Sequence, residues 1–187
     1  ELRKWIAGFV RRYDKDISPA NAELILDYVG NDMNRLSTEL KKLVAFLGDK
    51  SSIEKSDIES IVSESLQNKI FEMINAIVVR NTQKAMDIYE DLIALKEAPL
   101  KIISMIAGQF NQLLNIKNML MDGKGKKEIG TKLKLADYIV NKLVKQCQGF
   151  DQKRLYAYFH KCVELEYDVK RGVIGDRLAL ELIIAGD

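Results

Sequence analysis

The segment Gly30-Asn31-Asp32-Met33-Asn34-Arg35-Leu36-Ser37-Thr38-Glu39-Leu40-Lys41-Lys42-Leu43 carries the densest structural signals in the chain. Gly30 can adopt the left-handed conformation that ends a helix, and Asn31 or Asp32 can cap the helix that follows. Glu39 lies four residues after Arg35 and three before Lys42, so ion pairs can support the polar face. The apolar residues recur at helical spacing and form one stripe: Leu36, Leu40, Leu43, Val44 and Leu47. The segment predicts a tight hairpin of two helices, and it contains no recognisable catalytic group.

The composition of the whole chain fits this helical pattern. Of 187 residues, 47% are hydrophobic and 30% are charged, which is typical of an ordinary globular protein. Only 2 residues are proline, whereas average usage would give about nine. Strand-like alternation of polar and apolar residues is absent. We therefore expect an all-α protein with roughly ten helices and no strand.

Apolar runs and cysteines bear on the compartment. No apolar run approaches the roughly 18 residues that a membrane span requires, and no signal-peptide pattern opens the chain. Cys147 and Cys162 lack metal-ligand spacing and look like small core side chains in a reducing compartment. The sequence thus predicts a cytoplasmic protein with no membrane partner.

Helix signals divide the chain into two units, with a weak boundary at Ser63-Glu64-Ser65. In the first unit, Ser18-Pro19 opens a helix with a capping hydroxyl and a proline at the first helical position. Ser56, followed three residues later by Glu59, predicts a capping box on a short helix through Val62. In the second unit, Pro99 begins a long helix with a wide apolar face.

Catalytic constellations are missing from the pattern. His160 is the only histidine, which excludes triads and multi-histidine metal sites. No phosphate-binding loop of the Gly-x-x-x-x-Gly-Lys-Ser/Thr type occurs, and the carboxylates are scattered over polar faces. The sequence therefore predicts no catalytic residue, no nucleotide-binding loop, no metal site and no cofactor.

A basic patch is the one strong departure from even charge. Between residues 124 and 145 there are seven lysines and only two acidic residues, Glu128 and Asp137, so the local net charge is +5. The lysines are Lys124, Lys126, Lys127, Lys132, Lys134, Lys142 and Lys145. Residues 127–143 also have the rhythm of a helix-turn-helix, whose second helix would expose Asp137, Asn141 and Lys145. Such a patch can contact nucleic-acid phosphates, but it can equally be the solvated face of two short helices.

Several short segments, taken in order, resemble one family. They are Val29-Gly30-Asn31-Asp32-Met33 through Glu39-Leu40-Lys41-Lys42-Leu43, Asn68-Lys69-Ile70-Phe71, Ala76-Ile77, Lys84-Ala85-Met86, Pro99-Leu100-Lys101-Ile102, Gln109-Phe110, Leu113-Leu114 with Lys117, Lys126-Lys127-Glu128-Ile129, Tyr138-Ile139-Val140 and Ala179-Leu180-Glu181-Leu182. Over almost its whole length the chain resembles the C-terminal part of the delta subunits of bacterial DNA polymerase III clamp loaders. Asn111 departs from the arginine that the family would place after Gln109-Phe110.

This resemblance implies a fold and a role. Residues 1–64 would be the small helical lid of an AAA+ module, and residues 65–187 would be the collar domain that joins the loader subunits in a ring. The family's N-terminal AAA+ core, which grips the sliding clamp, would precede Glu1. Where related ATP-hydrolysing subunits carry a sensing arginine in a Gly-Ser-x-Arg pattern, this chain has Met33. That fits a subunit that binds no ATP.

The implied partners are other loader subunits of the gamma/tau and delta-prime types, the sliding clamp through the missing N-terminal region, and primer-template DNA in the assembled complex. The chain would be a non-catalytic accessory component of the polymerase holoenzyme. Candidate interface anchors are Phe110, Leu113, Leu114, Tyr156 and Tyr158. The simpler alternative puts most of them in the chain's own core, and it is favoured for the two leucines. The alternative function is a stand-alone helical nucleic-acid-binding protein that uses the patch from Lys124 to Lys145.

Overall fold

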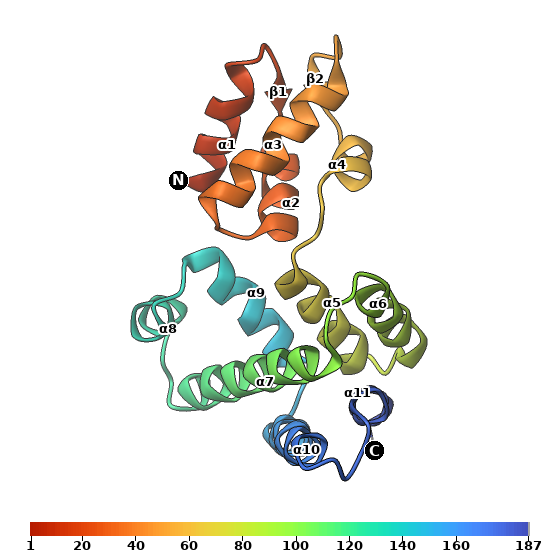
Figure 1. Ribbon diagram of the computed structural model, residues 1–187. Coiled ribbons are helices and arrows are strands. Elements are labelled where there is room, and N and C mark those ends of the chain that lie inside the picture. Colours follow the sequence, from red (N-terminus) through yellow and green to blue (C-terminus); the bar gives the residue numbers. More distant parts are fainter. Residues whose placement is uncertain (187) are drawn as a thin grey trace. The chain divides into compact units, whose positions relative to one another are not determined.

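The computed structural model describes residues 1–186 and is drawn in Figure 1. These residues form eleven α-helices and one pair of two-residue strands. The prediction of an all-α protein is confirmed. The prediction of no strand is wrong, because β1 (Asp16–Ile17) pairs in parallel with β2 (Ser52–Ile53). The chain separates into two compact units, Glu1–Lys69 and a second that begins at Ile70, and the division lies inside α5 (Leu66–Val78).

The hairpin predicted around Gly30 is the corner between α2 (Pro19–Val29) and α3 (Met33–Leu47). Gly30 ends α2 with a φ of 85°, in the left-handed region that glycine tolerates. Asp32, and not Asn31, is the N-cap of α3. Its carboxylate accepts the backbone N–H groups of Asn34 at 2.9 Å and Arg35 at 3.0 Å. The two helices therefore start and stop where the local sequence dictates.

The apolar stripe of α3 lies in the core of the first unit, between α1 (Leu2–Arg11), α2 and α4 (Lys55–Ile61). The buried members of this core are Ile6, Phe9, Val10, Ala22, Ile25, Leu26, Val29, Leu36, Leu40, Leu43, Leu47, Ile53, Ile58 and Val62. Each leucine removed from water contributes about 1.5–3 kcal/mol. Burial of the four stripe leucines is thus one substantial contribution to the stability of the unit.

The polar face of α3 binds the chain segment that leaves α4. The Glu39 carboxylate, whose residue is only 6% exposed, accepts the backbone N–H of Ser63 at 3.0 Å. It also pairs with Lys42 at 2.6 Å, as the spacing predicts. Arg35 donates to the Ser63 carbonyl at 3.2 Å. The backbone N–H of Ser65 in turn donates to the Tyr28 carbonyl at 2.6 Å, so the connection to α5 is held by α2 and α3.

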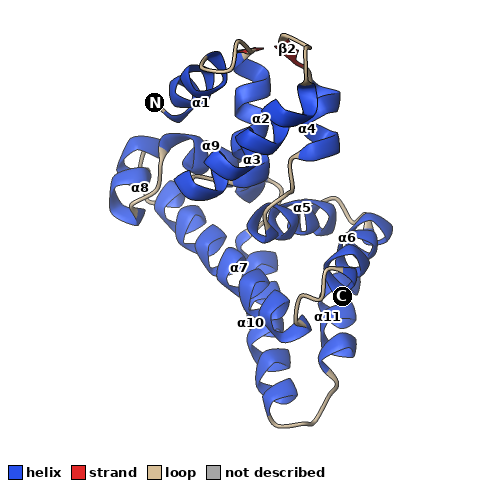
Figure 2. Cartoon of the chain, turned by 45° about the horizontal axis from the view of Figure 1, so that its top comes forward, coloured by secondary structure: helices blue, strands red, loops and turns tan. Residues whose placement is uncertain are grey.

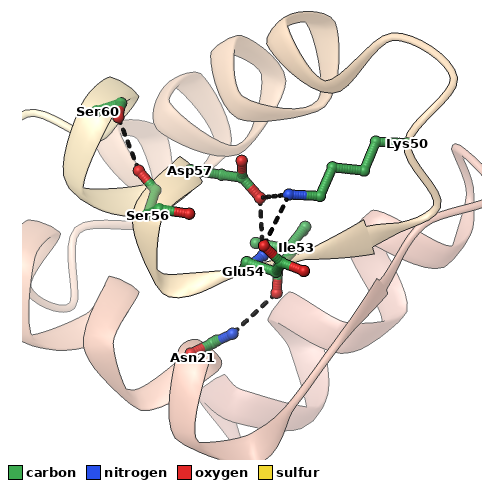
Figure 3. A network of polar contacts seen from close by, with 7 residues as sticks. All are labelled: Asn21, Lys50, Ile53, Glu54, Ser56, Asp57 and Ser60. Atoms are coloured by element: carbon green, nitrogen blue, oxygen red, sulfur yellow. Dashed lines mark hydrogen bonds and ion pairs between the residues drawn. The ribbon is translucent and has the colours of Figure 1, made fainter.

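The capping box of α4 is formed by Glu54 and Asp57, two residues earlier than predicted (Figure 3). The predicted capping box at Ser56 and Glu59 is therefore wrong. Glu54 is the N-cap, and Asp57 accepts its backbone N–H at 2.8 Å. The start of the helix is set by tertiary contacts: Ile53 pairs with Ile17, and its carbonyl accepts the Asn21 side chain at 2.8 Å. Glu54, the residue after Ile53, is thereby placed at the N-cap position of α4.

In the second unit, α7 (Pro99–Met121) is the central helix. It packs against α9 (Asp137–Gln148), α10 (Gln152–Lys170) and α11 (Asp176–Ala185), while α11 also packs against α6 (Thr82–Ala94). Figure 2 shows α10 running alongside α7. The short helix α8 (Lys126–Leu133) packs on α9.

A chain of buried amides links three of these helices. The Gln109 side chain on α7 donates to the Gln146 side-chain oxygen on α9 at 2.9 Å. Gln146 then donates to the carbonyl of Phe71 at 3.0 Å and to the side chain of Asn75 at 2.9 Å, both on α5. Burying a side-chain amide costs free energy unless its polar atoms are hydrogen-bonded. These contacts therefore favour the one placement of the three helices in which the bonds can form.

We expect Asp57→Ala to lower the free energy of unfolding at pH 7 by about 1 kcal/mol, the usual cost of a lost capping side chain. Asp57 also binds Lys50, whose Nζ lies 2.7 Å from its carboxylate. The matched control is Glu59→Ala on the same helix, which breaks only an exposed pair with Lys55 and should cost less. Urea denaturation of the wild type, Asp57→Ala and Glu59→Ala measures the loss of unfolding free energy in each variant.

The effect of Asp57→Ala should also depend on pH. The hydrogen bond from Lys50, followed by that from the Glu54 N–H, lowers the pKa of Asp57 below its ordinary value of 3.8. A lowered folded-state pKa stabilises the protein above that ordinary value, and the stabilisation disappears as the pH falls through the folded-state pKa. The difference between wild type and Asp57→Ala should therefore shrink below about pH 4. A difference that stays constant down to pH 2 would contradict this assignment.

Gln146→Leu should destabilise the second unit by about 1–3 kcal/mol, because it removes the three hydrogen bonds of a buried amide. Gln148→Leu, an exposed position on the same helix, is the control and should change stability little. Thermal unfolding measured by circular dichroism compares the two. Equal melting temperatures for both variants would show that the amide chain does not stabilise the unit.

Candidate interaction surfaces

Two of the predicted interface anchors lie in the core of the second unit. Phe110 and Leu113 on α7 are fully buried. The Phe110 ring stacks on Tyr158 with centroids 5.0 Å apart, and it meets Phe150 edge-on at 5.6 Å. The prediction that Phe110 is an exposed anchor is wrong, because Tyr158 of α10 covers its ring. The core position favoured for Leu113 is confirmed. Leu114 and Tyr158 are half-buried.

Tyr156 is the predicted anchor that does face outward, at 57% exposed. It begins a row along α10 that we call the α10 stripe: Tyr156, His160, Val163 and Tyr167, spaced by four, three and four residues. All four are exposed, Tyr167 by 58%, and the Tyr156 and His160 rings lie 4.2 Å apart. Two apolar side chains of α11, Leu178 and Leu182, are exposed as well. Sequence reasoning missed the stripe because α10 carries apolar residues on both faces.

The seven lysines of the basic patch differ in whether they contact other parts of the chain. Lys127, Lys132, Lys134 and Lys145 are exposed. Each of the other three has a local contact: Lys124 lies 3.8 Å from Glu128, Lys126 donates to Asn141 at 2.8 Å, and Lys142 lies over the Phe71 ring at 4.3 Å. Part of the patch thus contributes to packing on α5 and to holding α8 on α9.

The helix-turn-helix rhythm is present as helices α8 and α9 joined by a turn at residues 134–136. Lys134 takes the left-handed conformation, and the Leu135 N–H donates to the Gly130 carbonyl at 2.9 Å. A Cβ on Gly130 would lie 3.1 Å from the Leu135 oxygen, so a larger residue there would crowd the turn. Asp137, Asn141 and Lys145 are exposed. An open hollow of about 700 Å³ borders the turn, but helical hairpins of this kind are generic.

Met33 is the first residue of α3 and is 42% exposed. The N–H groups of that helix start are natural phosphate ligands, but here Asp32 already binds those of Asn34 and Arg35. A carboxylate at this place also repels phosphate. The corner is thus poorly suited to bind a nucleotide phosphate.

Reactive groups are sparse in the part of the chain that the structure describes. No group of three or more His, Cys, Asp or Glu residues within residues 1–186 is placed to hold a metal ion. Burial raises the pKa of the Cys162 thiol to about 12 and also raises that of Cys147, so both thiols are protonated at neutral pH. Over the same residues, every helix is too short or too polar to cross a membrane.

Fold and surfaces together define a class: a two-unit helical protein whose candidate sites are exposed apolar and basic surfaces on helices. A family model described as "DNA polymerase III delta subunit, C-terminal domain" matches residues 67–186. The chain belongs to this family.

Individual relatives agree with the family match. The chain is 29% identical over 184 residues to the DNA polymerase III subunit delta of Bacillus subtilis, covering 98% of this chain and 53% of the relative. It is 21% identical over 127 residues to a probable delta subunit of Aquifex aeolicus, covering 63% of this chain and 36% of that relative. The solved structure of the Bacillus subtilis DNA clamp loader delta protein superposes with a TM-score of 0.87 at 29% identity, over 98% of this chain and 54% of that one. The chain thus spans about half the length of these Bacillus subtilis proteins.

Phe110→Ala and Tyr156→Ser should separate core residues from surface residues. Phe110→Ala should cost about 3–5 kcal/mol of unfolding free energy, because it leaves a cavity beside Tyr158 and Phe150. Tyr156→Ser should cost less than about 1 kcal/mol, because its ring is mostly in water. Chemical denaturation measures both values. A small loss for Phe110→Ala would contradict the burial of this ring.

Proposed function

We propose that this chain is the lid and collar part of a bacterial clamp-loader delta subunit, which assembles with other loader subunits to load the sliding clamp on primed DNA. The observation that carries the proposal is the family match over residues 67–186, nearly the whole second unit. The fold similarity to the Bacillus subtilis clamp loader delta protein extends over 98% of the chain and therefore includes the first unit.

Within this proposal the two units have different tasks. Residues 1–64 act as an AAA+ lid-type helical domain, and residues 65–187 act as the collar, or oligomerisation, domain. The Asp32 cap and the side chain of Met33 support a lid that does not bind a nucleotide phosphate at the start of α3. Ser63 and Ser65, bonded to the first unit, support a firm attachment of the connecting segment.

The proposed partners are loader subunits of the gamma/tau and delta-prime types. Contact with the sliding clamp belongs to the half of the relatives that this chain does not match. Primer-template DNA is a partner only in the assembled complex. The chain performs no catalysis by itself and serves as an accessory component of the polymerase holoenzyme. Neither the relatives nor the structure supports the alternative of a stand-alone nucleic-acid-binding protein.

The α10 stripe is the proposed contact with a neighbouring subunit. Exposed tyrosines in a row supply large apolar area with few rotatable bonds, which favours their use as anchors in interfaces. Tyr156 and Tyr167 are each more than half exposed while the opposite face of α10 is packed on α7. A partner that covers the stripe would bury both rings.

Size-exclusion chromatography of the chain mixed with the other loader subunits tests the proposal. We expect co-elution in one complex, and separate elution of the chain would contradict the collar assignment. The double variant Tyr156→Ser/Tyr167→Ser should weaken assembly at least about tenfold, since each anchor typically contributes 1–2 kcal/mol or more.

The matched control is Met121→Ser, which removes a 65% exposed apolar side chain from the same unit, outside the stripe. It should assemble like the wild type. Melting temperatures of all variants check that each is folded. If the stripe variant and Met121→Ser assemble equally well, the stripe is not the contact, although co-elution of the wild type would still support the collar assignment.

A further inference from the structure

A pocket of about 320 Å³ in the second unit is lined by three cationic side chains that come from separate places in the sequence. Arg80 follows α5, while Arg154 and Lys161 lie about two helical turns apart on α10. Thr82, the first residue of α6, and Gly186 complete the polar lining. None of the described lining residues is acidic. A concave site with this charge favours an anion.

Arg154 is held in a fixed position at this pocket. Its guanidinium donates to the carbonyls of Ile77 at 3.1 Å and Val78 at 3.3 Å, at the C-terminal end of α5. The same group lies 5.1 Å from the Phe150 ring centroid and 5.7 Å from that of Tyr158. A guanidinium has five N–H donors in a rigid fork, so donors remain for a ligand at little further entropic cost.

Arg80 and the start of α6 form another part of the lining. Arg80 has a φ of 56°, and the Asn81 N–H that follows donates to the Ala76 carbonyl at 2.9 Å, which fixes the turn. Among the described residues no carboxylate lies within ion-pair distance of Arg80 or Arg154. Asn81 caps α6 by accepting the Lys84 N–H at 3.0 Å, while the N–H groups of Thr82 and Gln83 have no partner within the helix. The helix dipole adds positive potential.

We infer that this pocket, between Arg80, Thr82, Arg154 and Lys161, binds the phosphate group of a phosphate monoester. Lys161 already donates to the Gly186 carbonyl at 3.0 Å, so the two arginines and the helix N-terminus supply the main attraction. This attraction is stronger for a dianion than for a monoanionic carboxylate. The volume lies at the lower end of the range for small-molecule sites, so it has room for a phosphate with a sugar-sized substituent. Such a phosphate occurs on a free nucleotide and at the end of a nucleic-acid strand.

Titration of the full chain with inorganic phosphate and with AMP, followed by amide NMR and calorimetry, tests this inference. We expect saturable shifts of the Thr82 and Gln83 amides, and tighter binding of AMP than of phosphate. Arg80→Gln should weaken binding about tenfold, through loss of a charge-assisted bond. Its side chain is exposed, so the variant should fold normally, and an unchanged melting temperature verifies this.

Arg177→Gln is the matched control, since it removes the same charge from an exposed position of α11 outside the pocket. It should bind like the wild type. Competition between AMP and a 5′-phosphorylated dinucleotide, with the unphosphorylated dinucleotide as reference, separates the two sources of the phosphate. Preference for either phosphorylated ligand supports the site. Absence of saturable shifts, equal competition by acetate, or equal weakening by Arg177→Gln would overturn it.

Discussion

The side-chain amide of Gln146 is the contact on which the arrangement of the second unit depends. It lies among apolar residues and satisfies its donors and acceptor on two other helices, α5 and α7. Apolar packing alone tolerates small slips between helices, whereas an unbonded buried amide costs about 1–3 kcal/mol. This amide chain therefore selects one register. In that register Lys142 lies over Phe71, and part of the basic patch is drawn into packing.

The central position of α7 decides which side chains remain for binding. Phe110 and Leu113 are fully buried, and the Phe110 ring packs against Tyr158 of α10 and against Phe150. Because one face of α10 covers α7, its apolar residues on the other face stay in water, and these form the α10 stripe. Exposed tyrosines in a row on a packed helix are more typical of an interface than of a simple solvated face. The packing of α10 on α7 thus explains both why one face of α10 is buried and why the other is exposed.

Local chemistry made much of the fold predictable from the sequence. Ser18 caps α2, Gly30 ends it and Asp32 caps α3, because these effects act within a few residues. The capping box at Glu54 and Asp57 could not be located in this way, since pairing of Ile53 with Ile17 sets the helix start from a distance. The sequence likewise named Phe110 and Tyr156 as candidate anchors without showing that another helix covers Phe110 and leaves Tyr156 exposed. The cationic pocket combines Arg80 with residues of α10 that are remote in sequence, so no local pattern could reveal it.

The corner at Gly30 links the first unit to the proposed role. The same helix, α3, carries the Asp32 cap at its start and the Glu39–Lys42 pair along its polar face. The cap occupies the N–H groups that a phosphate would need, while Glu39 and Arg35 hold both backbone groups of Ser63. A helix whose Asp32, Arg35 and Glu39 side chains bind its own chain has little left at its start with which to sense a ligand. Under the proposed function, α3 therefore serves the lid as a rigid support for the segment that leads to the collar, and its charges act within the chain instead of on nucleotide.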